Sequence, residues 1–160
     1  MDRMRGRAVA LLMLLAGACG SQSGGAGVAA TIDVQRWSAV GQGSEFTPVA
    51  GGPTTFTILG YTPLSSGSKQ ADPTKPRLEF VFRDIVPAAG TYPVVANGPV
   101  AVMYMPDRLS AYGGYEGSVT IVRITSDHAE GTFDFKVKKA PEGTPIVTFT
   151  DGSFSVPIWR

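Results

Sequence analysis

Two residue types that often do chemistry occur once each in this 160-residue chain, as Cys19 and His128. Histidine offers an imidazole that can bind a metal or act as a general base, and Asp127 and Glu130 lie close to it in the sequence. One imidazole with two neighbouring carboxylates lacks the spaced ligands of a zinc site. We therefore interpret residues 126–130 as an exposed hairpin turn rather than a metal or catalytic centre.

Other catalytic signatures are missing from the sequence. There is no Gly-x-Ser-x-Gly segment to form a nucleophile elbow, and no glycine-rich loop with a lysine that could cradle phosphates. The dipeptide Asp151-Gly152 is compatible with a calcium loop, but ordinary turn chemistry explains it better. We therefore expect no enzymatic activity, no bound metal and no cofactor.

Four aromatic residues are candidates for binding a ligand, because aromatic walls suit sugars and apolar molecules. They are Trp37, Tyr104, Tyr112 and Tyr115. Tyr112 and Tyr115 flank two glycines, and we expect that segment to be a loop. The alternative is that all four aromatic side chains fill the core and its rims.

The sequence before Cys19 has the layout of a signal peptide. Residues 1–7 are rich in arginine, residues 8–16 are an apolar run, and small residues lead into the cysteine. The apolar run is shorter than the roughly 20 residues of a membrane-spanning helix. Residues 20–28 then read as a Gly/Ser-rich tether, with an average end-to-end distance of about 16 Å.

The segment Leu15-Ala16-Gly17-Ala18-Cys19 resembles the lipobox of bacterial lipoproteins, although leucine lies one place further from the cysteine than usual. The resemblance implies cleavage after Ala18 and acylation of Cys19, so that the partner is membrane lipid. An ordinary secretory signal cut at the same bond is the alternative. Because Gly20 replaces the aspartate that marks inner-membrane retention in some bacteria, we expect a lipid-anchored protein of the cell envelope at the outer membrane.

The charge of the mature chain excludes a nucleic-acid partner. The whole chain has a formal net charge of +1, and removing residues 1–18 takes away three arginines and one aspartate, leaving about −1. Nucleic-acid binding needs a basic excess to neutralise phosphates. We expect a signal peptide over residues 1–18, a lipidated cysteine and tether over residues 19–28, and one domain over residues 29–160.

Alternation of apolar and polar residues predicts an all-β domain. It is clearest over residues 131–138, and glycine or proline interrupts nearly every stretch long enough for a helix. The expected strands cover residues 31–37, 54–62, 77–85, 100–105, 118–125, 131–138, 146–150 and 154–158. Eight or nine short strands indicate an antiparallel sandwich or a calycin-like barrel, with residues 62–76 as a long polar loop.

A change of phase occurs near the C-terminus. Val147 and Phe149 are apolar at odd positions, whereas Phe154 and Val156 are apolar at even positions. Because side chains alternate strictly along a strand, a hairpin turn or a β-bulge must lie at Asp151-Gly152. We favour the bulge.

The C-terminal part resembles uncharacterised β-rich lipoprotein domains of bacteria, several of which look calycin-like. The matching segments are residues 119–135 and 147–156, with a weaker match over residues 32–39, where Val34 replaces a usual glycine. The resemblance implies a fold and a compartment, and no activity.

Three functions remain open. The chain is a membrane-anchored binding or structural module, a carrier of a small apolar ligand inside a calycin-like barrel, or, least favoured, a hydrolase. A carrier needs an interior cavity of several hundred Å³, whereas a module is packed solid.

Overall fold

The computed structural model describes residues 27–46, 55–83, 87–139 and 145–159. These residues form nine strands and no helix: β1 (Gly27–Ile32), β2 (Gln35–Phe46), β3 (Thr55–Tyr61), β4 (Arg77–Arg83), β5 (Gly90–Pro93), β6 (Val100–Met105), β7 (Tyr112–Ile124), β8 (His128–Lys139) and β9 (Ile146–Trp159). The expected signal peptide, Cys19 and most of the tether lie outside the described residues. The first strand that the structure describes starts at Gly27, two residues before the expected start of the domain.

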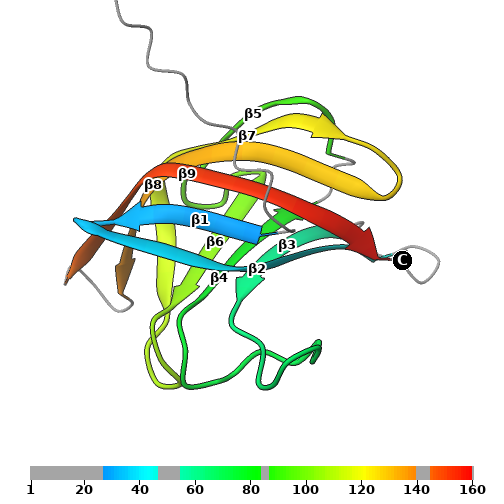
Figure 1. Ribbon diagram of the computed structural model, residues 1–160. Helices are drawn as coiled ribbons and strands as arrows, with labels where there is room; N and C mark the ends of the chain where they lie inside the picture. The colour runs from blue at the N-terminus through cyan, green and yellow to red at the C-terminus, as the bar shows by residue number, and fades with distance from the viewer. Residues whose placement is uncertain (1–26, 47–54, 84–86, 140–144, 160) are drawn as a thin grey trace, which may run out of the picture.

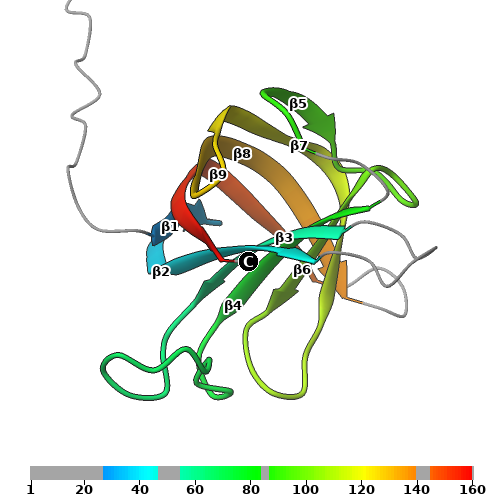
Figure 2. The ribbon, with the colours of Figure 1, turned by 90° about the vertical axis from the view of Figure 1, so that its right-hand side faces the viewer.

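The strands form a closed antiparallel barrel that runs up and down in chain order (Figures 1 and 2). The last strand, β9, pairs with both β8 and β1, and this closes the barrel. The fifth strand is extra to the eight-stranded wall. One edge of β7 pairs with β8. The other edge pairs with β6 near the start of β7 and with β5 further along it. The expected all-β fold is confirmed, as a barrel rather than a sandwich.

The first strand fills only part of the space between its neighbours. β1 pairs with β2 from Gly27 to Ile32 and with β9 along the same stretch. Beyond the N-terminal end of β1, β2 pairs directly with β9, and Gly43 and Ser44 lie parallel to Ile158 and Trp159. The chain therefore enters the barrel wall part-way along its height.

The barrel interior is filled by aromatic side chains. Phe80 is fully buried, and its ring centroid lies 5.0 Å from that of Phe133, 5.8 Å from Phe135 and 6.2 Å from Phe154. Phe135 in turn lies 4.8 Å from Phe149. Alternation places these residues on the inner faces of β4, β8 and β9, and their mutual burial forms the core.

The phase change near the C-terminus is a β-bulge within one continuous strand, so the favoured interpretation is confirmed. Two steps along β8, from Phe133 to Phe135, match three steps along β9, from Gly152 to Phe149. Asp151 has a φ of 51° at this position. The extra residue returns Phe154 to the inner face, as the sequence pattern requires.

Two glycines of this sheet make room for rings on the neighbouring strand. Gly152 pairs with Phe133, and a Cβ on Gly152 would lie 2.3 Å from that ring. Gly131 pairs with Phe154, and a Cβ there would lie 2.5 Å from the ring. The ring of each phenylalanine therefore packs directly over a glycine of the neighbouring strand.

Three details of the strand prediction are wrong. Residues 31–37 are a hairpin, because Asp33 and Val34 separate β1 from β2. The segment Tyr112-Gly113-Gly114-Tyr115 begins β7 and is not a loop. The strand β5 was not predicted, since residues 90–93 have little apolar alternation.

Residues 62–76 connect β3 to β4 outside the barrel wall, as expected. The connection has backbone hydrogen bonds of its own, because the N–H of Leu64 donates to Gln70 O and the N–H of Asp72 donates to Thr62 O. Lys69 places its Nζ 4.2 Å from the centre of the Trp159 ring. This connection, the β1–β2 hairpin and the β6–β7 connection (residues 106–111) lie at one end of the barrel, which we call the mouth.

Candidate binding site at the barrel mouth

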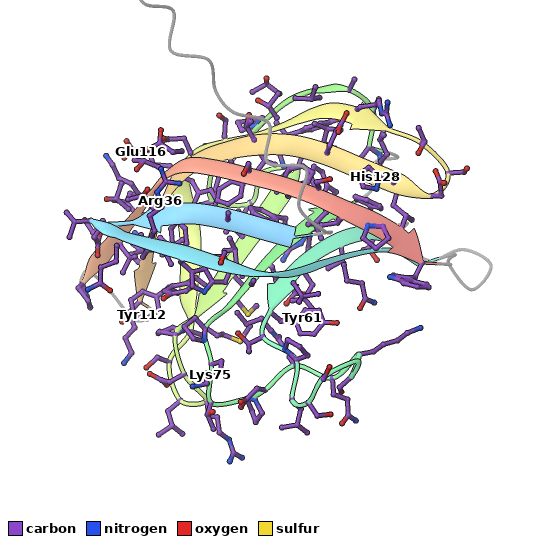
Figure 3. All side chains as sticks on the ribbon, viewed as in Figure 1. Arg36, Tyr61, Lys75, Tyr112, Glu116 and His128 are labelled. Carbon is purple, nitrogen blue, oxygen red and sulfur yellow. The ribbon has the colours of Figure 1, made fainter. Side chains whose placement is uncertain are left out.

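A hollow of about 410 Å³ opens at the mouth beside the β1–β2 hairpin. Its lining comes from the hairpin, from the residue before β4 and from β6: Ile32, Asp33, Val34, Gln35, Arg36, Trp37, Pro76 and Tyr104. Figure 3 shows Arg36, Tyr112 and Lys75 toward this end of the barrel and His128 toward the opposite end. The hollow is therefore a feature of the mouth and lies outside the packed interior.

The hairpin is fixed in place by a reciprocal pair of hydrogen bonds. The backbone N–H of Asp33 donates to Thr148 O at 2.7 Å, and the N–H of Thr148 donates to Asp33 Oδ1 at 2.9 Å. Asp33 has a φ of 53°, a conformation that aspartate tolerates in turns. Because Asp33 takes the positive φ, the turn does not need a glycine at Val34.

Tyr104 links the hollow to the aromatic core. Its ring centroid lies 5.0 Å from that of Phe149 and 5.9 Å from that of Tyr112. Burial raises the pKa of Tyr104, and the nearby Tyr112, Asp33 and Asp107 raise it further. The phenol of Tyr104 therefore remains protonated at neutral pH and can donate a hydrogen bond.

The structure brings three of the four predicted ligand-binding aromatics to the mouth. Trp37 and Tyr104 line the hollow, and Tyr112 packs directly behind Tyr104. Tyr115 does not join them, because it falls at a bulge of β7 and packs on the outer face, where Lys138 Nζ lies 5.1 Å from its ring centre. A ligand at the mouth would not contact Tyr115.

The sequence prediction missed the polar residues of the hollow. Asp33, Gln35 and Arg36 all belong to the hairpin that was taken for a single strand. The available signal was Asp33, because aspartate favours turns and tolerates a positive φ. Recognising that turn would have placed Arg36 and Trp37 together near one end of the sheet.

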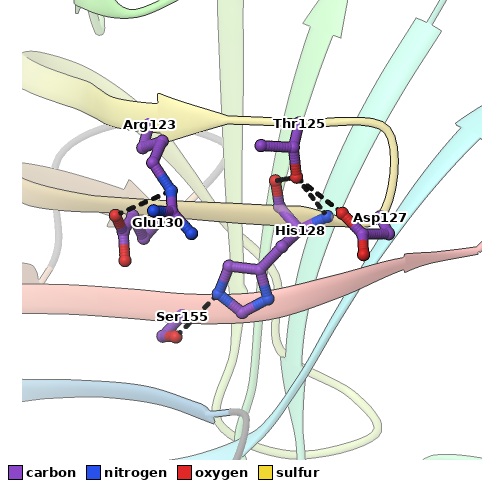
Figure 4. A network of polar contacts seen from close by, with 6 residues as sticks. All are labelled: Arg123, Thr125, Asp127, His128, Glu130 and Ser155. Atoms are coloured by element: carbon purple, nitrogen blue, oxygen red, sulfur yellow. Dashed lines mark hydrogen bonds and ion pairs between the residues drawn. The ribbon is translucent and has the colours of Figure 1, made fainter.

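His128 lies at the opposite end and begins β8 instead of lying in the turn. Figure 4 shows the contacts around it. The N–H of His128 donates to Thr125 Oγ1 at 3.1 Å, Thr125 Oγ1 donates to Asp127 Oδ1 at 2.7 Å, and His128 Nε2 lies 3.0 Å from Ser155 Oγ. The imidazole is half-buried. These contacts give His128 a structural role in joining the β7–β8 turn to β9.

The hollow has the groups of a binding site. Trp37 offers an aromatic surface, Arg36 offers a guanidinium and Tyr104 offers a hydroxyl. Its lining contains no serine, cysteine, histidine or lysine that could act as a nucleophile or base. Within the part of the chain that the structure describes, no three His, Cys, Asp or Glu side chains gather to hold a metal.

Comparison with family profiles, with curated protein sequences and with solved structures finds no match to this chain. The described residues include no helix with the length and apolar character needed to span a membrane.

Proposed function

We propose that this protein is a lipid-anchored binding module of the bacterial envelope that takes its ligand at the barrel mouth. The observation that carries the proposal is the hollow of about 410 Å³ in which Trp37, Arg36 and Tyr104 converge. An aromatic wall with a few polar groups suits the face of a sugar ring and its hydroxyls.

The filled interior favours binding at the mouth over transport of an apolar ligand inside the barrel. Phe80, Phe133 and Phe135 occupy the centre with at most 3% of their surface exposed. A deeply bound ligand would have to displace these rings, and protein interiors are too densely packed to allow this without large rearrangement. A ligand at the mouth needs no such change.

Anchoring is supported by the order of basic, apolar and small residues before Cys19. Two or three acyl chains on one cysteine would hold the domain durably at a membrane, whereas one chain binds only marginally. The tether of residues 20–26 then leads into β1 at Gly27.

The anchor is tested by Cys19→Ser in the full chain. We expect the wild type to enter the detergent phase and the membrane fraction, and the variant to be soluble or unprocessed. Equal partitioning of the two proteins would contradict the anchor.

Ligand binding is tested by tryptophan fluorescence, because the chain has only two tryptophans. In a Trp159→Phe background, Trp37 is the sole reporter and lies in the hollow. We expect a saturable change with soluble oligosaccharides, which Arg36→Ala weakens and Arg123→Ala, on β7, leaves unchanged. A flat response to neutral and acidic oligosaccharides would contradict sugar binding at the mouth.

A further inference from the structure

A second hollow lies near the mouth, against the outward faces of β4 and β6, and differs from the first in chemistry. Its volume is about 230 Å³, and it is lined by Ala71, Asp72, Pro73, Lys75, Arg77, Met105, Asp107 and Arg108. The two hollows are neighbours along the chain, since Pro76 precedes Arg77 and Tyr104 precedes Met105. The first hollow contains two aromatic side chains, Trp37 and Tyr104, and one cation, whereas the second contains three cations and no aromatic side chain.

The three cations are poorly neutralised by the rest of the described chain. Arg77 has a single long contact, from Nη2 to Glu79 Oε2 at 3.4 Å. Its Nε is buried and has no hydrogen-bond partner among the described residues. Lys75 and Arg108 form no ion pair within 4.0 Å with any side chain that the structure describes. A buried donor without an acceptor is unfavourable, so the guanidinium of Arg77 is incompletely satisfied by the described residues.

The two carboxylates of this hollow are committed to their own loops. Asp72 Oδ1 accepts hydrogen bonds from the N–H and the hydroxyl of Thr74, at 2.8 and 2.7 Å. Asp107 Oδ1 accepts one from the N–H of Leu109 at 2.7 Å. These bonds shape the two connections around the hollow. The lining holds three cations and two carboxylates, and Glu79, which contacts Arg77, is a third carboxylate beside it. Lys75 and Arg108 are therefore the cations of the hollow that have no ion pair within 4.0 Å among the described side chains.

We propose that this second hollow binds a compact oxyanion, such as a phosphate or carboxylate group, through Lys75, Arg77 and Arg108. A guanidinium matches the paired oxygens of such groups, and a lysine supplies a third donor from a flexible stem. Oxyanion binding in the second hollow is independent of whether the first hollow binds a sugar.

The test is a titration of the protein with inorganic phosphate and, separately, with acetate, followed by amide chemical shifts at constant ionic strength. We expect saturable shifts for residues 71–77 and 105–109, with sodium chloride giving none. Saturation by phosphate alone assigns the site to a tetrahedral oxyanion, and saturation by acetate as well assigns it to oxyanions in general.

Substitutions connect the shifts to the three cations. Arg77→Gln and Arg108→Gln should each weaken binding at least tenfold, whereas Arg83→Gln, at the opposite end of β4, should leave it unchanged. If Arg77→Gln loses the dispersed spectrum of a folded protein, Lys75→Gln replaces it in the comparison with Arg108→Gln. Trp37→Ala should leave phosphate binding unchanged. A loss of sugar binding can therefore be distinguished from a loss of phosphate binding.

The proposal is overturned by either of two results. One is the absence of saturable shifts with both anions. The other is equal weakening by Arg83→Gln and Arg108→Gln, since that would indicate general attraction to positive charge.

Discussion

The half-buried imidazole of His128 has one side-chain partner among the described residues, Ser155 Oγ at 3.0 Å. A hydrogen bond of this kind contributes about 0.5–1.5 kcal/mol to stability. We therefore expect His128→Ala and Ser155→Ala each to lower the free energy of unfolding by about 1 kcal/mol. Denaturant unfolding of both single variants and the double variant measures this.

The double variant decides what kind of role His128 has. If the two side chains act through their shared bond, the double variant should cost clearly less than the sum of the single costs. Additive costs would show that the contact contributes nothing. Stoichiometric metal that is lost in His128→Ala would contradict the structural role altogether.

Phe135 lies at the centre of the aromatic core, with 1% of its surface exposed and rings of Phe80, Phe133 and Phe149 around it. Truncating a buried phenylalanine to alanine costs about 3–5 kcal/mol, because transfer energy is lost and a cavity remains. A domain of this size is stable by about 5–15 kcal/mol. We expect Phe135→Ala to lower the melting temperature by on the order of 10 °C, as measured by thermal unfolding.

The matched control is the adjacent residue. Lys136 faces solvent, where its Nζ lies 2.8 Å from Glu116 Oε1. This hydrogen bond and the charge of Glu116 raise the pKa of Lys136, but exposed pairs of this kind add little to stability. Lys136→Ala should barely change the melting temperature. Similar losses for Phe135→Ala and Lys136→Ala would mean that β8 does not have the inward and outward faces described above.

The strand β9 depends on close approach at its bulge. A Cβ on Gly152 would meet the ring of Phe133 at 2.3 Å, whereas a Cβ on Gly113, in β7, would meet nothing within 4 Å. Gly152→Ala should therefore destabilise the protein by about 1–3 kcal/mol through overpacking. Gly113→Ala should be neutral or slightly stabilising, because it restricts the unfolded chain. Equilibrium unfolding of the two variants makes the comparison, and a neutral Gly152→Ala would contradict the packing.

The elements that the sequence predicted well are those with apolar side chains on a strict alternation. Most of β4, β8 and β9 was predicted in this way, whereas β6 was predicted from a run that is apolar on both faces. The bulge followed from the phase of Phe149 and Phe154. β2 was largely missed because Gly41, which lies on its inner face, has no apolar side chain to show the alternation. A Cβ on Gly41 would lie 2.3 Å from a methyl of Val156. Packing against Val156 therefore requires glycine at position 41, and the neighbouring sequence gives no sign of this requirement.

The mouth was predicted only in part, for a similar reason. Trp37, Tyr104 and Tyr112 were chosen for their residue type, and the structure brings them to one end of the barrel. Tyr115 was chosen for the same reason, but a bulge in β7 turns it outward. The second hollow was not predicted, because its cations come from β4 and from two connections that the pairing of β4 with β6 brings together.

Across the whole molecule, three connections rely on ionised aspartates. Hydrogen bonds from Thr74 lower the pKa of Asp72, those from Leu109 and Ser110 lower the pKa of Asp107, and that from Thr125 lowers the pKa of Asp127. A carboxyl whose pKa is lower in the folded state stabilises that state above its unfolded pKa and loses the effect as pH falls through the folded value. We therefore expect the folded protein to lose stability as pH falls below the ordinary aspartate value of 3.8.

Amide chemical shifts provide a direct measurement of this effect. The N–H groups of Thr74 and Leu109 donate to Asp72 and Asp107 and should titrate with midpoints below 3.8. Asp72→Asn should remove the titration at Thr74 and leave that at Leu109. Midpoints at or above 3.8 would contradict the predicted stabilisation of the carboxylates.

The partial first strand has a mechanical consequence. β1 starts at Gly27 and runs toward the mouth, with β2 bonded to one edge and β9 to the other. A pulling force applied at Gly27 and resisted by a ligand at the mouth would act along the strand. Bonds on both edges would then share the load in shear and would have to fail together instead of unzipping one at a time. A force on the N-terminal end of β1 would therefore meet more resistance than a force on a strand that is bonded along one edge only.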